Sequence, residues 1–451
     1  MEGLDKDDWW SRSQVLVIFV GLAKAEGVAL GPHLDRFRSI LSCSLTDESL
    51  YGVRFTALNV AIHLVLCLEE QRDRDRFQEL LLSMICTLID ALNHLNGIPE
   101  DIDKALEMFI RLVQTEPMLS RKQLVCVLSA MMQIAVVEKF GEGVRHLALK
   151  FIITLSEAGE TIARMMRELL RFIHLLFPIL LKMILDIKED PSWQDAGKED
   201  ENYQDISSHH RFGQDCLSGL SMSLGGDRMI PVALELLPAY LAAPQWQKRY
   251  AALICLAQIA KGCSKAMTNY IDELVSMVLQ SFEAPHPRVR WAAQIVIRKL
   301  SAGLDEEASI PYLDCLVHKL VPLLQNEEQM IQEQAMIAFA SIAETHQELF
   351  QKHSDSIVPD LKAILMNATD EPDRKLGAMS MSSISFVSQV VDELLKEEQG
   401  SQLEPDDPKS HHMLKALRLW VKCLPITDDP IETKVEHLRS MLRGLKGIAR
   451  T

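Results

Sequence analysis

Few side chains of this sequence have the types and spacing that catalysis or metal binding requires. The adjacent pairs His209–His210 and His411–His412 offer imidazoles, but neighbouring side chains on a helix do not share a face, so we expect solvated loops there. Ser223–Gly226 resembles a phosphate-binding turn but lacks the lysine and spacing of a P-loop, and we expect a turn between helices. The motifs GxSxG, HExxH and GxGxxG are absent. We therefore expect no enzyme, with no catalytic residue, no cofactor and no metal site.

An acidic run is the strongest chemical signal in the chain. Residues 186–205 hold eight acids against two lysines, a local net charge of −6. Such a segment steers basic partners toward it and weakens with salt, and a tryptophan in its middle offers an anchor. A solvated insertion without function is the alternative. The candidate residues for contact with a basic partner in this acidic loop are Glu189, Asp190, Trp193, Asp195, Glu199, Asp200, Glu201 and Asp205.

Helical repeats must position these residues, since apolar side chains recur at three- and four-residue steps along most of the chain. Four segments share a turn, a basic or polar residue and then a helix of small residues. Aligning Ala252, Ala293, Ala335 and Ala378 gives steps of 41, 42 and 43 residues. Each segment follows another apolar helix, and Pro238, Pro322 and Pro359 interrupt these first helices. Two helices per 40 to 47 residues is the period of HEAT and armadillo repeats, so we predict an all-α fold, an α-solenoid of HEAT-type antiparallel helix pairs.

Large and basic side chains stand near the start of the predicted second helices. Arg54, Arg290 and Lys248 have two interpretations, a structural ladder with acids of neighbouring repeats or contacts with a ligand on the concave face. Trp246 and Trp291 also have two interpretations, packing in the core or contact with a ligand on the concave face. The candidate concave-face contacts are Trp246, Arg290 and Trp291.

Composition and charge exclude several classes of function. The net charge of −16 over 451 residues leaves no basic footprint for nucleic acid and disfavours anionic membranes. The nine cysteines include no CxxC pair and indicate reduced thiols. The most apolar run, Phe172–Leu185, contains His174 and Lys182 and is too short for a membrane span, so we expect no membrane insertion. No basic segment precedes Val15–Ala23, and we expect no signal peptide.

Shifts in composition predict the domain organisation. We expect an N-terminal HEAT-like helical array over 1–185, an acidic loop insertion over 186–212, regular HEAT repeats over 213–391, an acidic linker over 392–408, a helix over 409–424 and a basic C-terminal tail over 425–451.

Several stretches go beyond a generic solenoid and resemble one family. They are PHPRVRWAA (285–293), SLGGDRMIPVALELLPAYLAAPQWQKRYAALICLAQIAKGCSKAM (223–267), IPYLDCLVHKLVPLLQN (310–326) and PDLKAILMNATD (359–370). These residues resemble the importin-five (karyopherin β3) branch of the importin-β superfamily, and several of the residue choices are similar to those of plant members. Family members are much longer, so the resemblance describes a truncated chain.

The resemblance implies a nuclear transport receptor that shuttles between cytoplasm and nucleus through the nuclear pore. Such a receptor binds basic nuclear-localisation-signal cargo on its inner face, contacts Phe-Gly nucleoporins and releases cargo when the GTPase Ran binds in its GTP form. Missing N-terminal repeats would weaken Ran binding. Two alternatives stay open: a HEAT-repeat protein-interaction scaffold, and a truncated importin paralogue that has lost Ran control.

Overall fold

The computed structural model describes residues 18, 21, 32–47, 51–93, 99–189, 207–301, 306–345 and 353. Every regular element among them is a helix, and these residues form no strand. The predicted all-α fold of HEAT-type helix pairs is confirmed. No described helix combines the length and apolar character needed to cross a lipid bilayer.

By its contacts the chain divides into two units. Unit 1 comprises Met1–Met183 with Arg211–Val232, and unit 2 comprises Ile184–His210 with Ala233–Thr451. This division differs from the predicted boundary at residue 213, because Arg211–Val232 pack with the N-terminal array.

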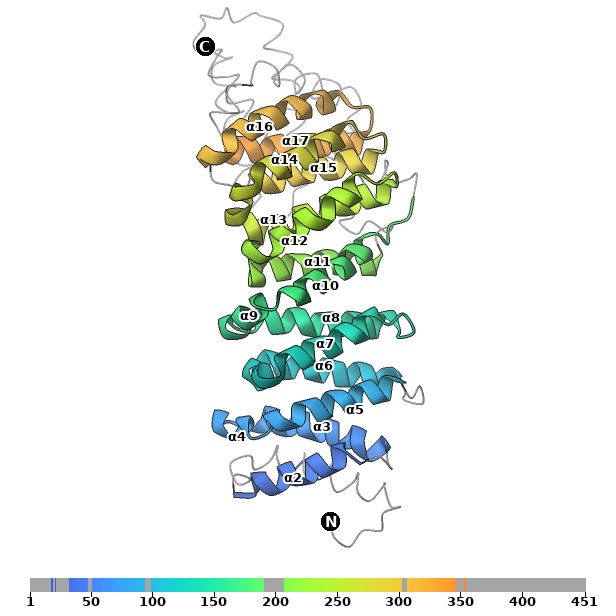
Figure 1. Cartoon of the computed structure of the whole chain (residues 1–451). Coiled ribbons are helices and arrows are strands. Elements are labelled where there is room, and N and C mark those ends of the chain that lie inside the picture. The colour runs from blue at the N-terminus through green and yellow to red at the C-terminus, as the bar shows by residue number, and fades with distance from the viewer. Residues whose placement is uncertain are drawn as a thin grey trace, which may run out of the picture. The chain divides into compact units, whose positions relative to one another are not determined.

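Unit 1 consists of helix pairs that stack in successive layers (Figure 1). First helices α2, α5 and α7 contact one another in series, and second helices α3, α6 and α8 do the same. The second helices approach closely because each buries an alanine completely, Ala57, Ala105 or Ala148. The elements are α2 (Leu34–Leu45), α3 (Tyr51–Cys67), α4 (Gln71–Asp75), η2 (Gln78–Leu80), α5 (Leu81–Asn93), α6 (Pro99–Thr115), η3 (Pro117–Gln123), α7 (Leu124–Val136), α8 (Glu142–Glu157), α9 (Glu160–Arg167), α10 (Leu170–Ile184) and α11 (Ser208–Leu224).

Unit 2 holds the repeats that the alanine spacing predicted. Second helices α13, α15 and α17 pack side by side, and α14 packs against α16. Ala252, Ala293 and Ala335 lie on these three second helices and are at most 1% exposed. The fourth alanine, Ala378, lies outside the described residues, as does Pro359. The elements are α12 (Gly226–Leu241), which begins in unit 1, α13 (Trp246–Met267), η5 (Thr268–Tyr270), α14 (Ile271–Leu279), η6 (Gln280–Glu283), α15 (Pro287–Ser301), α16 (Glu306–Leu320), η7 (Val321–Gln325) and α17 (Gln329–Thr345).

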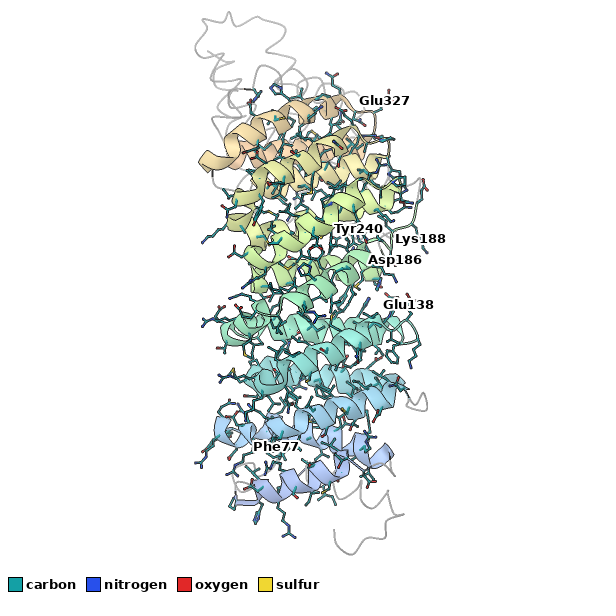
Figure 2. All side chains as sticks on the ribbon, in the orientation of Figure 1. Phe77, Glu138, Asp186, Lys188, Tyr240 and Glu327 are labelled. Atoms are coloured by element: carbon teal, nitrogen blue, oxygen red, sulfur yellow. The ribbon has the colours of Figure 1, made fainter. Side chains whose placement is uncertain are left out.

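Proline and glycine end or interrupt helices as the sequence indicates. Pro238 lies inside α12, and α16 gives way to the 3₁₀ helix η7 next to Pro322. Gly225 has φ +80° between α11 and α12, which confirms the predicted turn at Ser223–Gly226. Side chains fill the space between the stacked helices; Phe77, labelled in Figure 2, is 1% exposed.

The last residues of the predicted loop insertion 186–212 are helical, because α11 begins at Ser208. The hydroxyl of Ser207 accepts a hydrogen bond from the backbone N–H of His210 at 3.1 Å, as helix N-caps do. His210 is fully buried, so the prediction of a solvated His209–His210 loop was wrong. The prediction was based on the polar composition of this stretch, but His210 lies in the first turn of α11 and its imidazole is buried. The pair His411–His412, the linker 392–408, the helix 409–424 and the tail 425–451 lie outside the described residues.

Candidate binding surfaces

Unit 2 contains a cluster of aromatic rings at the start of its second helices, called here the aromatic cluster: His210, Trp246, Tyr250, His286 and Trp291. Trp246 and His286 stack with ring centroids 3.9 Å apart and an interplanar angle of 5°. Tyr250 lies 6.2 Å from Trp246, 6.4 Å from Trp291 and 5.9 Å from His210, centroid to centroid.

The repeat geometry explains this cluster. Trp246 and Tyr250 are one turn apart on α13, so they share a face, and Trp291 occupies the first turns of the neighbouring second helix α15. Tyr250 is 2% exposed, whereas Trp246 and Trp291 are half-buried. The cluster therefore has a packed centre and two indole rings that reach the surface.

Basic side chains surround the cluster. The guanidinium of Arg288 lies 5.7 Å from the Trp246 ring, in the range of a cation–π contact. Burial lowers the pKa of His286, the nearby carboxylate of Glu189 opposes that shift, and Arg288, Arg249 and Arg290 add to it. Three arginines and the carboxylate of Glu189 thus lie close enough to His286, which stacks on Trp246, to act on its charge.

Both ends of the acidic segment are anchored beside this cluster. The hydroxyl of Ser207 donates a hydrogen bond to the Asp186 carboxylate at 2.7 Å, which joins the two ends. His210 donates from Nδ1 to the carbonyl of Ile184 at 2.7 Å and stacks on Tyr250. Asp186 and Lys188 are exposed on the segment that follows α10 (Figure 2). Of the predicted loop residues Glu189 is described and exposed; Asp190, Trp193, Asp195, Glu199, Asp200, Glu201 and Asp205 lie outside the described residues.

Arg290 belongs to a structural ladder. Its guanidinium pairs with Glu328 at the start of the next repeat and donates to the carbonyls of Ala284 and Pro285 at 2.8 and 3.0 Å. Arg54 in unit 1 repeats the arrangement, with the Leu45 carbonyl at 3.2 Å and Asp90 of the next repeat at 2.6 Å. The geometry matches the ladder interpretation of these arginines, and Lys248 is exposed.

An apolar groove lies in unit 1 between α7 and α10. Its volume is about 880 Å³, and Glu168 and Arg171 stand among its mainly apolar lining. Val125, Val136, Leu170 and Leu175 line it and are 57%, 54%, 47% and 64% exposed. The sequence analysis missed this groove, although the all-round apolar character of residues 124–136 was a usable signal. Of the neighbouring methionines, Met131 is buried in the core and Met132 lines the groove.

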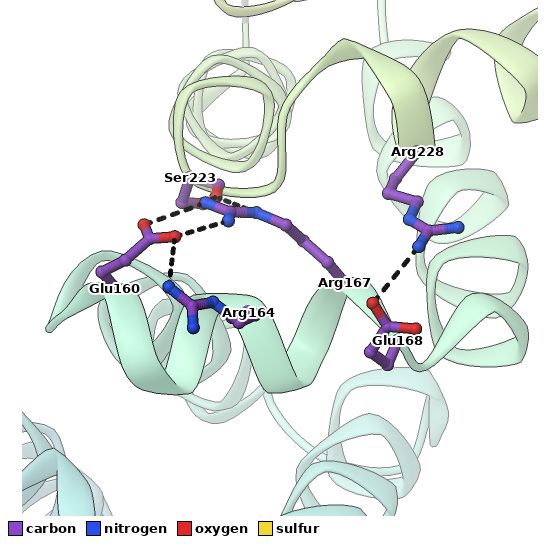
Figure 3. A network of polar contacts seen from close by, with 6 residues as sticks. All are labelled: Glu160, Arg164, Arg167, Glu168, Ser223 and Arg228. Atoms are coloured by element: carbon purple, nitrogen blue, oxygen red, sulfur yellow. Dashed lines mark hydrogen bonds and ion pairs between the residues drawn. The ribbon is translucent and has the colours of Figure 1, made fainter.

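A polar network fixes the helices next to this groove (Figure 3). Arg167 on α9 donates to the carbonyl of Ser223 at 2.8 Å, near the end of α11, and to the carboxylate of Glu160 at 2.8 Å. Glu168, which lines the groove, pairs with Arg228 on α12 at 3.3 Å. Arginine at the carbonyl end of a helix satisfies acceptors that the helix leaves open, so the network holds α9 against α11.

Comparison with protein families gives three matches. Residues 137–231 match the importin repeat, residues 6–130 match the IPO5-like TPR repeats, and residues 247–338 match the vacuolar 14 Fab1-binding region. Together with the relatives below, the first two confirm the predicted resemblance. The chain resembles the importin-5 branch of the importin-β superfamily.

Curated relatives and solved structures agree with this. The chain is 22% identical to importin subunit beta-3 of Saccharomyces cerevisiae over 60% of this chain and 29% of that protein. It is 23% identical to a probable importin-5 homolog of Dictyostelium discoideum over 88% of this chain and 41% of that protein. The crystal structure of Kap121p matches with a TM-score of 0.61 at 18% identity, covering 94% of this chain and 45% of that one. The chain thus spans less than half the length of these relatives, and the structural likeness supports the HEAT-type fold.

Proposed function

We propose that this chain is a nuclear transport receptor of the importin type that binds basic import-signal peptides at the aromatic cluster. The observation that carries the proposal is the anchoring of both ends of the acidic segment beside Trp246 and Trp291. Neither part suffices alone, because the arginines around the indole rings repel a basic peptide. The acidic segment supplies the opposite charge, and the aromatic rings offer flat apolar surface for lysine and arginine side chains.

Binding then has two stages. The acidic segment attracts the cationic peptide, mainly by raising the association rate. The aliphatic parts of the peptide's lysine and arginine side chains then pack against the rings of the aromatic cluster. Its rings are already stacked on one another, so little conformational entropy is lost when a peptide settles on them.

Release by the GTP form of Ran completes the proposed cycle. The likeness to the crystal structure of Kap121p bound to RanGTP, with a TM-score of 0.58 at 18% identity, supports this step. The apolar groove of unit 1 is our proposed contact for Phe-Gly nucleoporins, since its exposed aliphatic side chains suit a phenylalanine ring; a crystal structure of Kap121p bound to Nup53p is also similar to this chain, with a TM-score of 0.60.

A pull-down tests the proposal directly. The chain is immobilised, loaded with a fluorescent basic signal peptide and treated with Ran carrying GTP or GDP. We expect peptide binding and its loss with the GTP form alone. Binding that Ran-GTP leaves unchanged would support the alternative of a HEAT-repeat scaffold without Ran control, and no peptide binding would refute the proposal.

Variants locate the two surfaces. Trp291→Ala should weaken the basic peptide about tenfold, whereas Tyr240→Ala, an aromatic residue on α12, should leave it unchanged. Val125→Glu with Leu175→Glu should abolish capture of a Phe-Gly peptide. Met222→Glu is the matched control, because Met222 is 56% exposed on α11 and is not among the groove-lining residues.

A further inference from the structure

A cluster of potential metal ligands lies in unit 2 and shares no residue with either proposed peptide surface. Asp314 and His318 stand one turn apart on α16, and His353 reaches them from beyond α17 in the chain. One ligand atom from each of the three residues lies within 4.8 Å of the others. The contact joins positions 39 residues apart, so the fold rather than local sequence assembles it.

The geometry of the three side chains is close to that of a bound-metal set. Nε2 of His353 lies 2.5 Å from Oδ1 of Asp314, and the rings of His318 and His353 meet edge to face with centroids 4.9 Å apart. In a tetrahedral zinc site with bonds of about 2.0–2.1 Å, ligand atoms stand about 3.3 Å apart. The Asp314–His353 pair must therefore open by about 0.8 Å, and the ligand atom of His318 must approach by up to about 1.5 Å, which its exposed ring can do by rotating.

Burial and chemistry favour one kind of ion. His353 is 8% exposed and the Asp314 side chain 29% exposed, so two ligands are held in place while His318 opens to solvent. Two imidazoles and one carboxylate form a ligand set of the kind that binds Zn²⁺, with water in the fourth position. A hydrogen-bonded Asp314–His353 pair without a metal is the competing explanation.

We propose that Asp314, His318 and His353 form a Zn²⁺ site that ties α16 to the chain beyond α17. The metal would take the place of the hydrogen bond between Nε2 of His353 and Oδ1 of Asp314 and would hold both side chains together with His318. Because an ion bound only to the folded state stabilises it, the site would act as a clamp on this end of the repeat array.

Zinc titration of the whole chain tests the proposal. Zn²⁺ alone is titrated against a chromophoric chelator, and the thermal midpoint is recorded with and without the ion. We expect the wild-type chain to bind one more equivalent of Zn²⁺ than His318→Ala or Asp314→Asn. If the stoichiometry is equal, the tightest Zn²⁺ equivalent of the wild type should bind about tenfold or more tightly than that of either variant. Zn²⁺ should raise the midpoint of the wild-type chain by more than that of either variant.

Matched controls separate this site from adventitious binding. Cys315→Ser removes an exposed thiol next to Asp314, and His174→Ala removes an exposed imidazole of unit 1; both should bind zinc like the wild type. His318 is exposed, so His318→Ala should keep the fold, which circular dichroism checks. Equal zinc stoichiometry, affinity and thermal shift in wild type and His318→Ala would overturn the proposal and leave the hydrogen-bonded pair.

Discussion

Single buried residues on the second helices set how closely the repeats approach. Ala293 is fully buried on α15, which packs between α13 and α17. A leucine side chain, with three more carbon atoms than alanine, has no room there unless the helices separate.

We therefore expect Ala293→Leu to destabilise unit 2. Overpacking of a dense core typically costs about 1–3 kcal/mol, and chemical denaturation followed by circular dichroism measures the loss. Ala242→Leu is the control, because Ala242 is exposed just beyond α12. An unchanged unfolding midpoint for Ala293→Leu would show that the second helices tolerate wider spacing than the repeat register implies.

His210 links stability to pH. Burial lowers the pKa of His210 from 6.5 to about 4, while its bond to the Ile184 carbonyl and the charge of Asp186 oppose the shift and Arg288 and His209 add to it. The unfolded chain thus binds a proton below pH 6.5 that the folded chain does not accept until about pH 4. Stability should fall as the pH drops through this window, and it should stay at its full value above 6.5.

His210→Gln should remove this dependence, which amounts to about 3 kcal/mol between the two pKa values. Unfolding free energies of wild type and variant, measured from pH 7 to pH 4, give the difference. The exposed His33 provides the comparison, since His33→Gln should leave the pH profile of the wild type intact. Parallel profiles for wild type and His210→Gln would contradict the buried neutral imidazole.

At the scale of elements, an arginine connects each of two second helices, α3 and α15, to the loop before it and to the next repeat. The Arg290–Glu328 pair is largely buried, with side chains 16% and 25% exposed, and the same guanidinium meets two loop carbonyls. Loss of the arginine leaves a carboxylate and two carbonyls short of a donor.

We expect Arg290→Ala and Glu328→Ala to be coupled. A double-mutant cycle on unfolding free energy should give an interaction of about 1 kcal/mol or more. The exposed pair Lys319–Glu283 is the matched control and should show no measurable coupling. If Arg290→Ala weakened a bound peptide and left stability unaltered, the ligand-contact interpretation of Arg290 would replace the ladder.

The acidic segment is a second feature at the scale of elements, and we expect it to speed the association of basic peptides. Neutralising Glu199, Asp200, Glu201 and Asp205 together should slow association of a basic peptide and flatten its salt dependence, because charge attraction extends only about 8 Å at physiological ionic strength. Stopped-flow measurements at several salt concentrations test this. An uncharged partner should bind at an unchanged rate, and an unaltered salt slope for the basic peptide would favour the solvated insertion.

At the scale of the whole molecule, a repeat array is held together by contacts between neighbours. Destabilising changes far apart in the array should therefore add. Phe109→Ala removes a fully buried ring that meets Phe151 edge to face at 6.4 Å in unit 1, while Ala293→Leu acts in unit 2. The double variant should lose the sum of the two single losses within about 0.5 kcal/mol. A larger departure would show that the two sites are energetically coupled.

The sequence by itself determined the helical repeat, because alanine spacing, apolar periodicity and proline positions are local properties that act alike in each unit. It also placed the acidic run and the residues Trp246, Arg290 and Trp291 at the start of second helices. Only the tertiary structure decided what these residues touch. It decided that His210 is buried, that Arg290 pairs with Glu328, that a groove lies between α7 and α10 and that Asp314 contacts His353. Each of these features depends on residues that are far apart in the sequence. Such contacts depend on how the helices pack against one another, and the residue type at a single position does not specify that packing.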